Sequence, residues 1–209
     1  MPISRVVALA LTLALAACGR GGGSTPPVPV QQPLAVFAVQ RLTLTPAGYL
    51  RADTSAWWRQ GGAVTARGAD SALVSALTAR GLAQNWLLPA ALVAAWERNR
   101  TYAADPYRLA LQPLRSAEFV AASRFGEPLS TQLRTMIALH EDARLVLVPI
   151  ELRFEPVGAA ARGVLKLALL DPRYAHATWV GTVEGEAAST PQAALASVAT
   201  KVADLFIAP

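Results

Sequence analysis

The chain has 209 residues, of which 53% are hydrophobic and 16% charged, and these proportions exclude long disorder and collagen-like architectures. One cysteine and two histidines exclude an internal disulfide framework, a zinc site built on cysteines and a metal site built on three histidines, so we expect neither a metal nor a cofactor. The formal net charge of +5 is carried by arginine, since the only lysines are Lys166 and Lys201.

Residues 1–17 have the order of a lipoprotein signal peptide. Arg5 gives a positive start, and the apolar run that follows is too short to span a bilayer as a mature helix. Leu15-Ala16-Ala17-Cys18 resembles the bacterial lipobox, in which small residues admit the peptidase and the cysteine thiolate takes a diacylglyceryl group. We therefore predict attachment of acyl chains such as palmitate at Cys18. The alternative is an ordinary signal peptide followed by a chance cysteine.

Residues 18–33 form a predicted tether rich in glycine and proline, and residues 34–209 a single predicted domain. Fully extended, a tether of this length reaches about 45 Å. Two or more acyl chains hold a protein firmly on a bilayer. Gly19 stands where an aspartate would retain a lipoprotein in the inner membrane. In a Gram-negative cell we therefore expect an outer-membrane lipoprotein that faces the periplasm.

The first half of the domain is predicted to form several short helices, strands and loops. Asp70 is expected to cap a helix, Gly81 suits the position after its last turn, and Pro89 suits a first helical position. Residues 49–68 are expected to form a loop or short hairpin, and residues 86–88 a short strand. The remaining expected elements are a strand over 34–45, a helix over 70–81, a helix over 89–98 and a helical stretch over 105–114.

The last eighty residues give the clearest pattern. A helix over 128–140 is followed by strands over 144–155, 163–170 and 176–186 and by a helix from Pro191, capped by Thr190. The links are too short for crossovers, which predicts an antiparallel meander. We therefore predict an α/β (α+β) two-layer sandwich with one mixed sheet, this C-terminal meander, and helices mainly on one face.

In the first strand of the meander, strict alternation predicts two faces. One would carry Val146, Val148, Ile150, Leu152 and Phe154, and the other would carry Leu145, Leu147, Glu151, Arg153 and Glu155.

No complete catalytic motif occurs, since the sequence has no GxSxG, no GxxxxGK[ST] and no strand-linked GxGxxG. His140-Glu141 begins like a metalloprotease HExxH, but the second histidine is replaced by Arg144. Glu151 and Glu155 could serve as an acid and a base in catalysis, although carboxylates that alternate along a strand more often mark its solvent-exposed face. We therefore expect no catalytic residues and no enzyme.

The arginines are scattered, without a basic run interleaved with aromatic residues, so nucleic acid is not an expected partner. Some arginines would meet solvent or anionic lipid headgroups. Trp57-Trp58 stands out, because one of two adjacent tryptophans usually stays exposed and an exposed tryptophan is a good interface anchor. We therefore take Trp57 and Trp58 as candidate partner contacts.

Residues 167–181, LALLDPRYAHATWVG, resemble the strand, Asp, turn, Trp, Gly hairpin of a group of bacterial envelope lipoproteins, with Asp171, Trp179 and Gly181 at the matching positions. The group includes the curli secretion lipoprotein CsgG, the penicillin-binding-protein activator LpoB and the N-terminal domain of TolB. The resemblance implies a non-catalytic α/β domain over about residues 34–206. The pore-forming segments of the secretion channel are missing, so a channel is not implied.

A second resemblance, to auxiliary lipoproteins of ABC-type lipid transport systems, is carried by Tyr49-Leu50 and Arg153-Phe154-Glu155. It also implies a non-catalytic protein. The leading hypothesis is a lipid-anchored, non-enzymatic module that binds another envelope component. The alternatives are an ABC-transport accessory protein, which requires an apolar groove between helices and sheet, and an envelope-polymer hydrolase, which requires Glu151, Glu155 and His140 to converge. The oligomeric state stays open.

Overall fold

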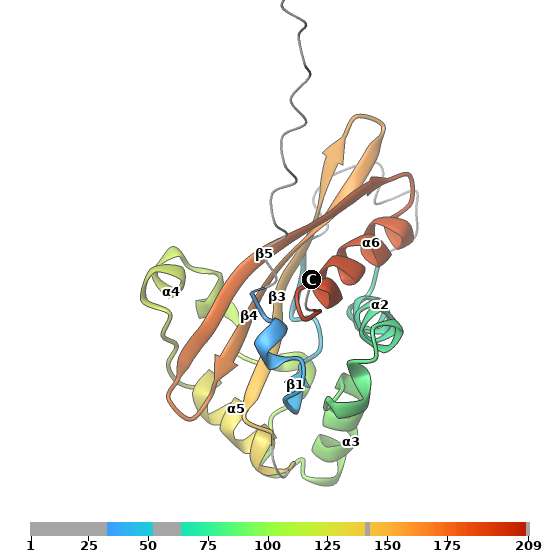
Figure 1. Ribbon diagram of the computed structural model, residues 1–209. Helices are drawn as coiled ribbons and strands as arrows, with labels where there is room; N and C mark the ends of the chain where they lie inside the picture. The colour runs from blue at the N-terminus through green and yellow to red at the C-terminus, as the bar shows by residue number, and fades with distance from the viewer. Residues whose placement is uncertain (1–32, 52–63, 141–142, 208–209) are drawn as a thin grey trace, which may run out of the picture. The chain divides into compact units, whose positions relative to one another are not determined.

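A computed structural model of the chain describes residues 33–51, 64–140 and 143–207, and Figure 1 shows its elements. Within these residues, five α-helices accompany one five-stranded mixed sheet with the order β1-β3-β4-β5, in which β2 also pairs with β3. This confirms the α/β class and the mixed sheet. The predicted signal peptide over 1–17 and nearly all of the tether over 18–33 lie outside the described residues and stay predictions.

The C-terminal meander is confirmed. Strands β3 (Leu145–Val157), β4 (Ala160–Asp171) and β5 (His176–Ala188) pair antiparallel in chain order. Strand β4 begins three residues before the predicted start at 163, because Ala160, Ala161 and Arg162 join the ladder opposite Val157, Pro156 and Glu155. The β4–β5 pairing shifts register twice, between Arg162 and Val164 and between Leu169 and Leu170.

Two three-residue strands lie parallel to β3 along its other edge. They are β1 (Leu42–Leu44), which pairs with the start of β3, and β2 (Tyr49–Arg51), which pairs with residues 151–153. Beyond β1, the strand expected at 86–88 is reduced to a single bridge between Leu87 and Thr43.

The strand predicted over 34–45 is wrong for its first eight residues. Ala35–Phe37 form a 3₁₀ turn, η1, after Leu34, which is fully buried and donates its amide hydrogen to the carbonyl oxygen of Leu205. Val36 and Val39, which lie within that predicted strand, are 72% and 86% exposed. The pattern failed because these apolar side chains do not mark a buried face.

Two helices begin where the sequence predicted, and a third begins earlier. Pro191 opens α6 (Pro191–Asp204) with Thr190 as its cap, and Pro89 opens α3 (Pro89–Arg98), as predicted. Helix α2 (Ala66–Ala79) begins earlier than expected, because Thr65 accepts the capping hydrogen bond from the Gly68 amide.

After α2, Gly81 has φ +73°, and its amide bonds back to Thr78 while the Leu82 amide bonds back to Leu77. The helical stretch expected over 105–114 is two 3₁₀ turns, η3 (Pro106–Arg108) and η4 (Gln112–Arg115). The short 3₁₀ turn η2 (Ala83–Asn85) links α2 to the Leu87 bridge.

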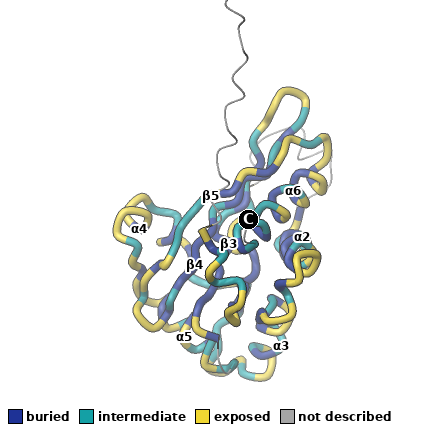
Figure 2. The backbone as a smooth tube through the Cα atoms, in the orientation of Figure 1, coloured by how far each residue is buried: buried dark blue, intermediate teal, exposed yellow. Residues whose placement is uncertain are grey.

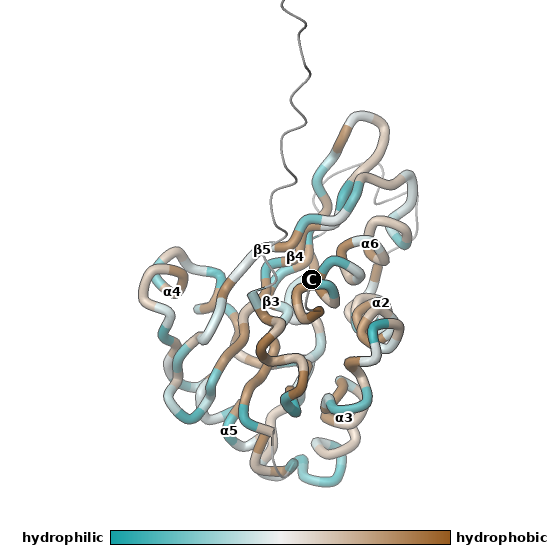
Figure 3. The backbone as a smooth tube through the Cα atoms, viewed as in Figure 1, coloured by the Kyte–Doolittle hydropathy of each residue, from teal (hydrophilic) through white to brown (hydrophobic). Residues whose placement is uncertain are grey.

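The main core lies between the sheet and the two longest helices, α2 and α6, which share one face as expected (Figure 1). On the second face, α5 (Leu129–Ala138), the short α4 (Ala117–Ala122) and η4 cover the half of the sheet near the start of β3, which adds a partial third layer to the predicted two. Figure 2 shows β3 and β4 mostly buried, and exposed stretches at α4 and at the β3–β4 turn. Hydrophobic residues follow the central strands in Figure 3.

The predicted alternation along β3 is wrong after Ile150. Val146, Val148 and Ile150 pack into the second-face core, whereas Leu152 and Phe154 pack with Leu145 and Leu147 under α2 and α6. The cause is a register shift against β4 between Pro149 and Glu151, since one extra residue reverses the side on which every later side chain lies. The alternating charges of residues 151–155 therefore lie on the second face, beyond the part that α5 covers.

Helix α6 packs on the sheet over two glycines. A β-carbon at Gly185 would lie 2.8 Å from the backbone nitrogen of Val198, and one at Gly163 would lie 3.1 Å from the carbonyl oxygen of Ala194. The absence of a side chain at these two positions lets the helix backbone approach β4 and β5 closely.

Candidate functional site

A charged surface occupies the second face of the sheet toward the β3–β4 turn, and we call it the ion-pair face. Its six residues come from η4 and from three neighbouring strands, and they are Arg115, Glu151, Arg153, Glu155, Arg162 and Glu184.

Strand pairing in the meander sets the geometry of the ion-pair face, because Glu155 lies opposite Arg162 in the register of β3 and β4. Arg162 bonds Glu155 at 3.1 Å and Glu184 at 2.8 Å, and Arg153 bonds the other oxygen of Glu155 at 3.0 Å. One carboxylate thus holds two guanidinium groups across two strands.

At the inner end of the ion-pair face the contacts are more buried. The Arg115 Nε donates to the Glu151 carboxylate at 2.6 Å, and the guanidinium carbon lies 4.1 Å from the centre of the Tyr49 ring. Lys166 donates to the backbone carbonyls of Leu114 and Arg115, and burial lowers the pKa of this lysine. These contacts tie η4 to β3, β4 and β2.

Acid–base catalysis does not fit the two carboxylates that the sequence singled out. Glu151 bonds Arg115 at 2.6 Å, whereas Glu155 bonds Arg153 and Arg162, so the two carboxylates are held by different partners. Hydrogen bonds from Arg162 and Arg153 lower the pKa of Glu155, which keeps it ionised and unfit to donate a proton. Both carboxylates are already engaged by arginines.

His140 lies in a different environment. It lines a small cavity with Trp96 and Met136 near the end of α5, and neither Glu151 nor Glu155 lines that cavity. Burial, with Arg41 and Arg98 nearby, lowers the pKa of the imidazole. The three side chains that the hydrolase hypothesis needs in one place are therefore not brought together.

Buried Asp70 was predicted as a cap and is instead a connector. It lies inside α2, where its carboxylate accepts hydrogen bonds from the Ala47 amide and the Tyr107 hydroxyl, both at 2.7 Å. Burial raises the pKa of Asp70, and burial together with the hydrogen bond to Asp70 raises the pKa of Tyr107 to about 12. The carboxylate thus joins α2 to the β1–β2 link and to η3.

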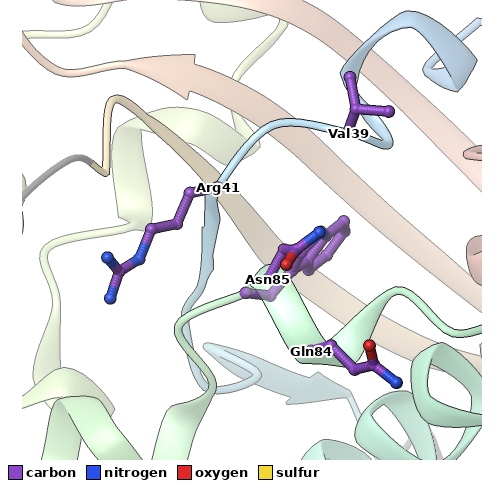
Figure 4. Close-up of a pocket in the computed structure, with 5 residues that line it drawn as sticks. Val39, Arg41, Gln84 and Asn85 are labelled. Carbon is purple, nitrogen blue, oxygen red and sulfur yellow. The ribbon is translucent and has the colours of Figure 1, made fainter.

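The hollow in Figure 4 has a volume of about 350 Å³ and is lined by Val39, Arg41, Gln84, Asn85 and Trp86. The Arg41 side chain extends away from Asn85 and Gln84, so the polar groups do not converge on one point. This arrangement gives an open depression rather than a small-molecule site.

Cys18, Trp57 and Trp58 lie outside the described residues, so lipid attachment and partner contact at these positions stay predictions. In the described part of the chain, no three His, Cys, Asp or Glu side chains are grouped so that they could hold a metal ion. Within the same residues, no helix has the length and apolar character that crossing a membrane requires.

No protein-family model matches the sequence, and no curated protein matches it either. Two solved structures with a similar chain trace are PelC dodecamers from Paraburkholderia phytofirmans. One has 14% identity and a TM-score of 0.41, and the match covers 84% of this chain and 93% of that chain. The other, a single-residue variant, has 14% identity and a TM-score of 0.40 and covers 82% and 91%. At this level the likeness supports no argument about function. The resemblances drawn from Asp171, Trp179 and Gly181 and from Tyr49-Leu50 stay predictions.

Proposed function

We propose that the chain is a lipid-anchored, non-enzymatic envelope lipoprotein that acts as a binding or assembly module for another component of the cell envelope. The observation that carries the proposal is the position of Cys18, the only cysteine, directly after Leu15-Ala16-Ala17 and before a predicted tether rich in glycine and proline. Gly19 favours the outer membrane as the site of anchoring.

The ion-pair face supports a binding role. Its outer arginines and glutamates are 31% to 51% exposed, and exposed ion pairs contribute only about 0 to 1 kcal/mol each to folding. A partner with complementary charges could therefore replace these contacts at little cost in stability. Arginine and tyrosine, which meet at Arg115 and Tyr49, are enriched at protein interfaces. Trp57 and Trp58 are proposed as further contacts.

No observation favours the two alternatives. A lipid-transport role needs a groove between helices and sheet, but in the described residues that space is filled by fully buried side chains such as Leu77, Leu147 and Phe206. A hydrolase needs the convergence of His140 with Glu151 and Glu155, which lie in separate environments.

The anchor is tested by replacing Cys18 with serine in the full chain and separating membranes from soluble material. We expect the wild-type chain, and a matched Ser24→Ala variant, to incorporate labelled palmitate and to sediment with the outer membrane. The Cys18→Ser chain should incorporate none and stay unprocessed. Equal palmitate incorporation in the Cys18→Ser chain would overturn the proposal.

The binding role is tested by crosslinking in intact cells. A photoreactive residue at position 184 on the ion-pair face should give one discrete adduct, and a matched residue at Glu118, exposed on α4, should not. The charge reversal Arg162→Glu should reduce the adduct at position 184. Mass measurement then decides whether the adduct joins two copies of this chain or a different protein. An adduct pattern that is the same at positions 184 and 118 would contradict the assignment of this surface.

A further inference from the structure

A row of exposed arginines crosses the end of the sheet at which β1 and β3 begin. Arg41 and Arg144 precede the paired residues Leu42 and Leu145, so they are neighbours in the register of the two parallel strands. Arg124 bridges to His176 at the start of β5. We call Arg41, Arg98, Arg124, Arg144 and Arg173 the arginine end.

Other members of the arginine end are placed by their contacts. Arg98 is the last residue of α3, whose Trp96 lines the same small cavity as His140. Arg173 lies in the turn that follows β4 and bonds Asp171. Since adjacent strands are about 4.8 Å apart, the row follows one edge of the molecule across all of its main strands.

The arginine end differs from the ion-pair face in how its charges are matched. Among the described residues, Arg41, Arg98, Arg124 and Arg144 have no carboxylate within 4 Å, whereas every arginine of the ion-pair face has one. The sequence places Glu141 and Asp142 beside Arg144, outside the described residues. Even when these two, Asp171 and Glu97 are all counted, the arginines outnumber the carboxylates five to four. The arginine end is therefore left with a positive charge that the described fold does not balance.

The described fold begins at Leu34, in the same half of the molecule as the arginine end. Leu34 bonds Leu205 just past the end of α6, where Phe206 packs edge-on against Trp86 at 4.8 Å, next to the Leu87 bridge to β1. Val36 and Val39, the exposed apolar residues between this point and Arg41, lie in the same segment. The β3–β4 turn is twelve residues away along β3, or about 40 Å.

We propose that the arginine end docks on an anionic lipid surface and so orients the domain with the β3–β4 turn and the ion-pair face directed away from the bilayer. This inference rests on the proposed lipid anchor, which brings the membrane within the length of a tether of fifteen residues from Leu34. Lipid phosphates supply the negative charge that the described fold lacks at this end. Each arginine near an anionic membrane contributes about 1 kcal/mol, or about a fivefold preference.

The orientation can be measured on the full, acylated chain in vesicles. Because the thiol of Cys18 is blocked by acylation, an introduced cysteine is the only free thiol. Thr178→Cys places a fluorophore near the arginine end and Val157→Cys places one at the far turn, and both positions are exposed. Energy transfer to an acceptor in the lipid headgroups reports which end lies nearer the membrane.

In vesicles of phosphatidylcholine with roughly a third phosphatidylglycerol, transfer should be stronger from position 178 than from 157. The difference should vanish in phosphatidylcholine alone and in high salt, which screens charges. Arg41→Gln with Arg144→Gln should lower the equilibrium constant between the oriented and the unoriented states about 25-fold, at fivefold for each arginine, so the difference in transfer should vanish at a lower salt concentration than in wild type. The matched pair Arg153→Gln with Arg162→Gln removes the same charge from the far end and should leave the difference intact.

Equal transfer from the two positions in anionic vesicles would overturn the inference, as would a difference that does not depend on lipid charge, which would indicate orientation by the tether or by another protein. Flotation of the same samples separates this outcome from failure of the proposed function. A chain that floats with both kinds of vesicle but is not oriented is anchored without docking. A chain that floats with neither lacks the lipid anchor altogether.

Discussion

The buried carboxylate of Asp70 offers the sharpest test of the fold. Replacing it with alanine removes the acceptor of the amide of Ala47, a residue that is only 3% exposed, and the acceptor of the Tyr107 hydroxyl. An unsatisfied buried donor costs about 1 to 3 kcal/mol, and Tyr107 is exposed enough to find water. We expect a loss of about 2 kcal/mol, or about 4 to 8 °C in Tm for a unit of this size.

Asp70→Asn separates the hydrogen bonds from the charge. The amide oxygen can still accept from Ala47 and the amide nitrogen can donate to the Tyr107 oxygen, so we expect a change in stability of less than about 1 kcal/mol at neutral pH. Burial raises the folded pKa of Asp70 above its ordinary value of 3.8, so protonation favours the folded state. The contribution of this titration is complete below pH 3.8 and is lost as the pH rises through the folded pKa. Wild type should therefore lose stability relative to the Asn variant over that range.

Urea unfolding of the three proteins, followed by circular dichroism between pH 3.5 and 7.5, measures both effects. If Asp70→Ala proves as stable as wild type, the carboxylate does not hold α2 to the β1–β2 link. If Asp70→Asn is destabilised as much as Asp70→Ala, the charge itself matters rather than the two hydrogen bonds. A stability difference between wild type and the Asn variant that does not change with pH would refute the assigned direction of the pKa shift.

Two further predictions concern α6 and α5. Gly185→Ala should destabilise the fold by about 1 to 3 kcal/mol in urea, because its β-carbon meets the Val198 backbone at 2.8 Å, whereas Gly126→Ala, with open space at that position, should change stability by less than about 0.5 kcal/mol. Burial lowers the folded pKa of His140 below 6.5, so its contribution to stability is present above pH 6.5 and is lost as the pH falls through the folded pKa. The imidazole resonances of His140 should titrate below pH 6.5 in the folded protein, and the loss should be absent in His140→Gln; a His140 midpoint above 6.5 would contradict the assignment.

Features that depend on neighbours in sequence were predictable. The cap at Thr190, the helix starts at Pro89 and Pro191 and the left-handed Gly81 follow from the chemistry of one or two residues. The meander also followed, because each of its links is only a few residues long.

Features that depend on residues distant in the sequence could not be predicted. Aspartate is a residue type typical of helix caps, which is why Asp70 was predicted as one. Its carboxylate can be buried only because Ala47 and Tyr107, 23 and 37 residues away, donate hydrogen bonds to it. The register shift after Pro149 depends on pairing with β4, and it alone decides which face carries Glu151.

Only half of the residues of the ion-pair face could be predicted from the sequence. The alternating charges from Glu151 to Glu155 were apparent, but three of the six residues come from other elements, and a single strand does not reveal its counterions. The unmatched arginines were seen as scattered, because Arg41 and Arg144 are about a hundred residues apart in the chain and become neighbours only through parallel pairing. Cys18, Trp57 and Trp58 rest on motif and composition alone.

The irregular outer strand has a consequence for how this protein behaves at high concentration. A straight 13-residue strand at the rim of a sheet invites the same strand of another molecule to add to it, which is a route to fibrils. In β5 the two register shifts against β4 disturb that template. Backbone groups near both ends are also taken, since the Ala177 amide bonds Ser123 and the Glu186 amide bonds the Ser197 hydroxyl. Crowding on a membrane surface should therefore favour reversible contacts through side chains over irreversible joining of sheets.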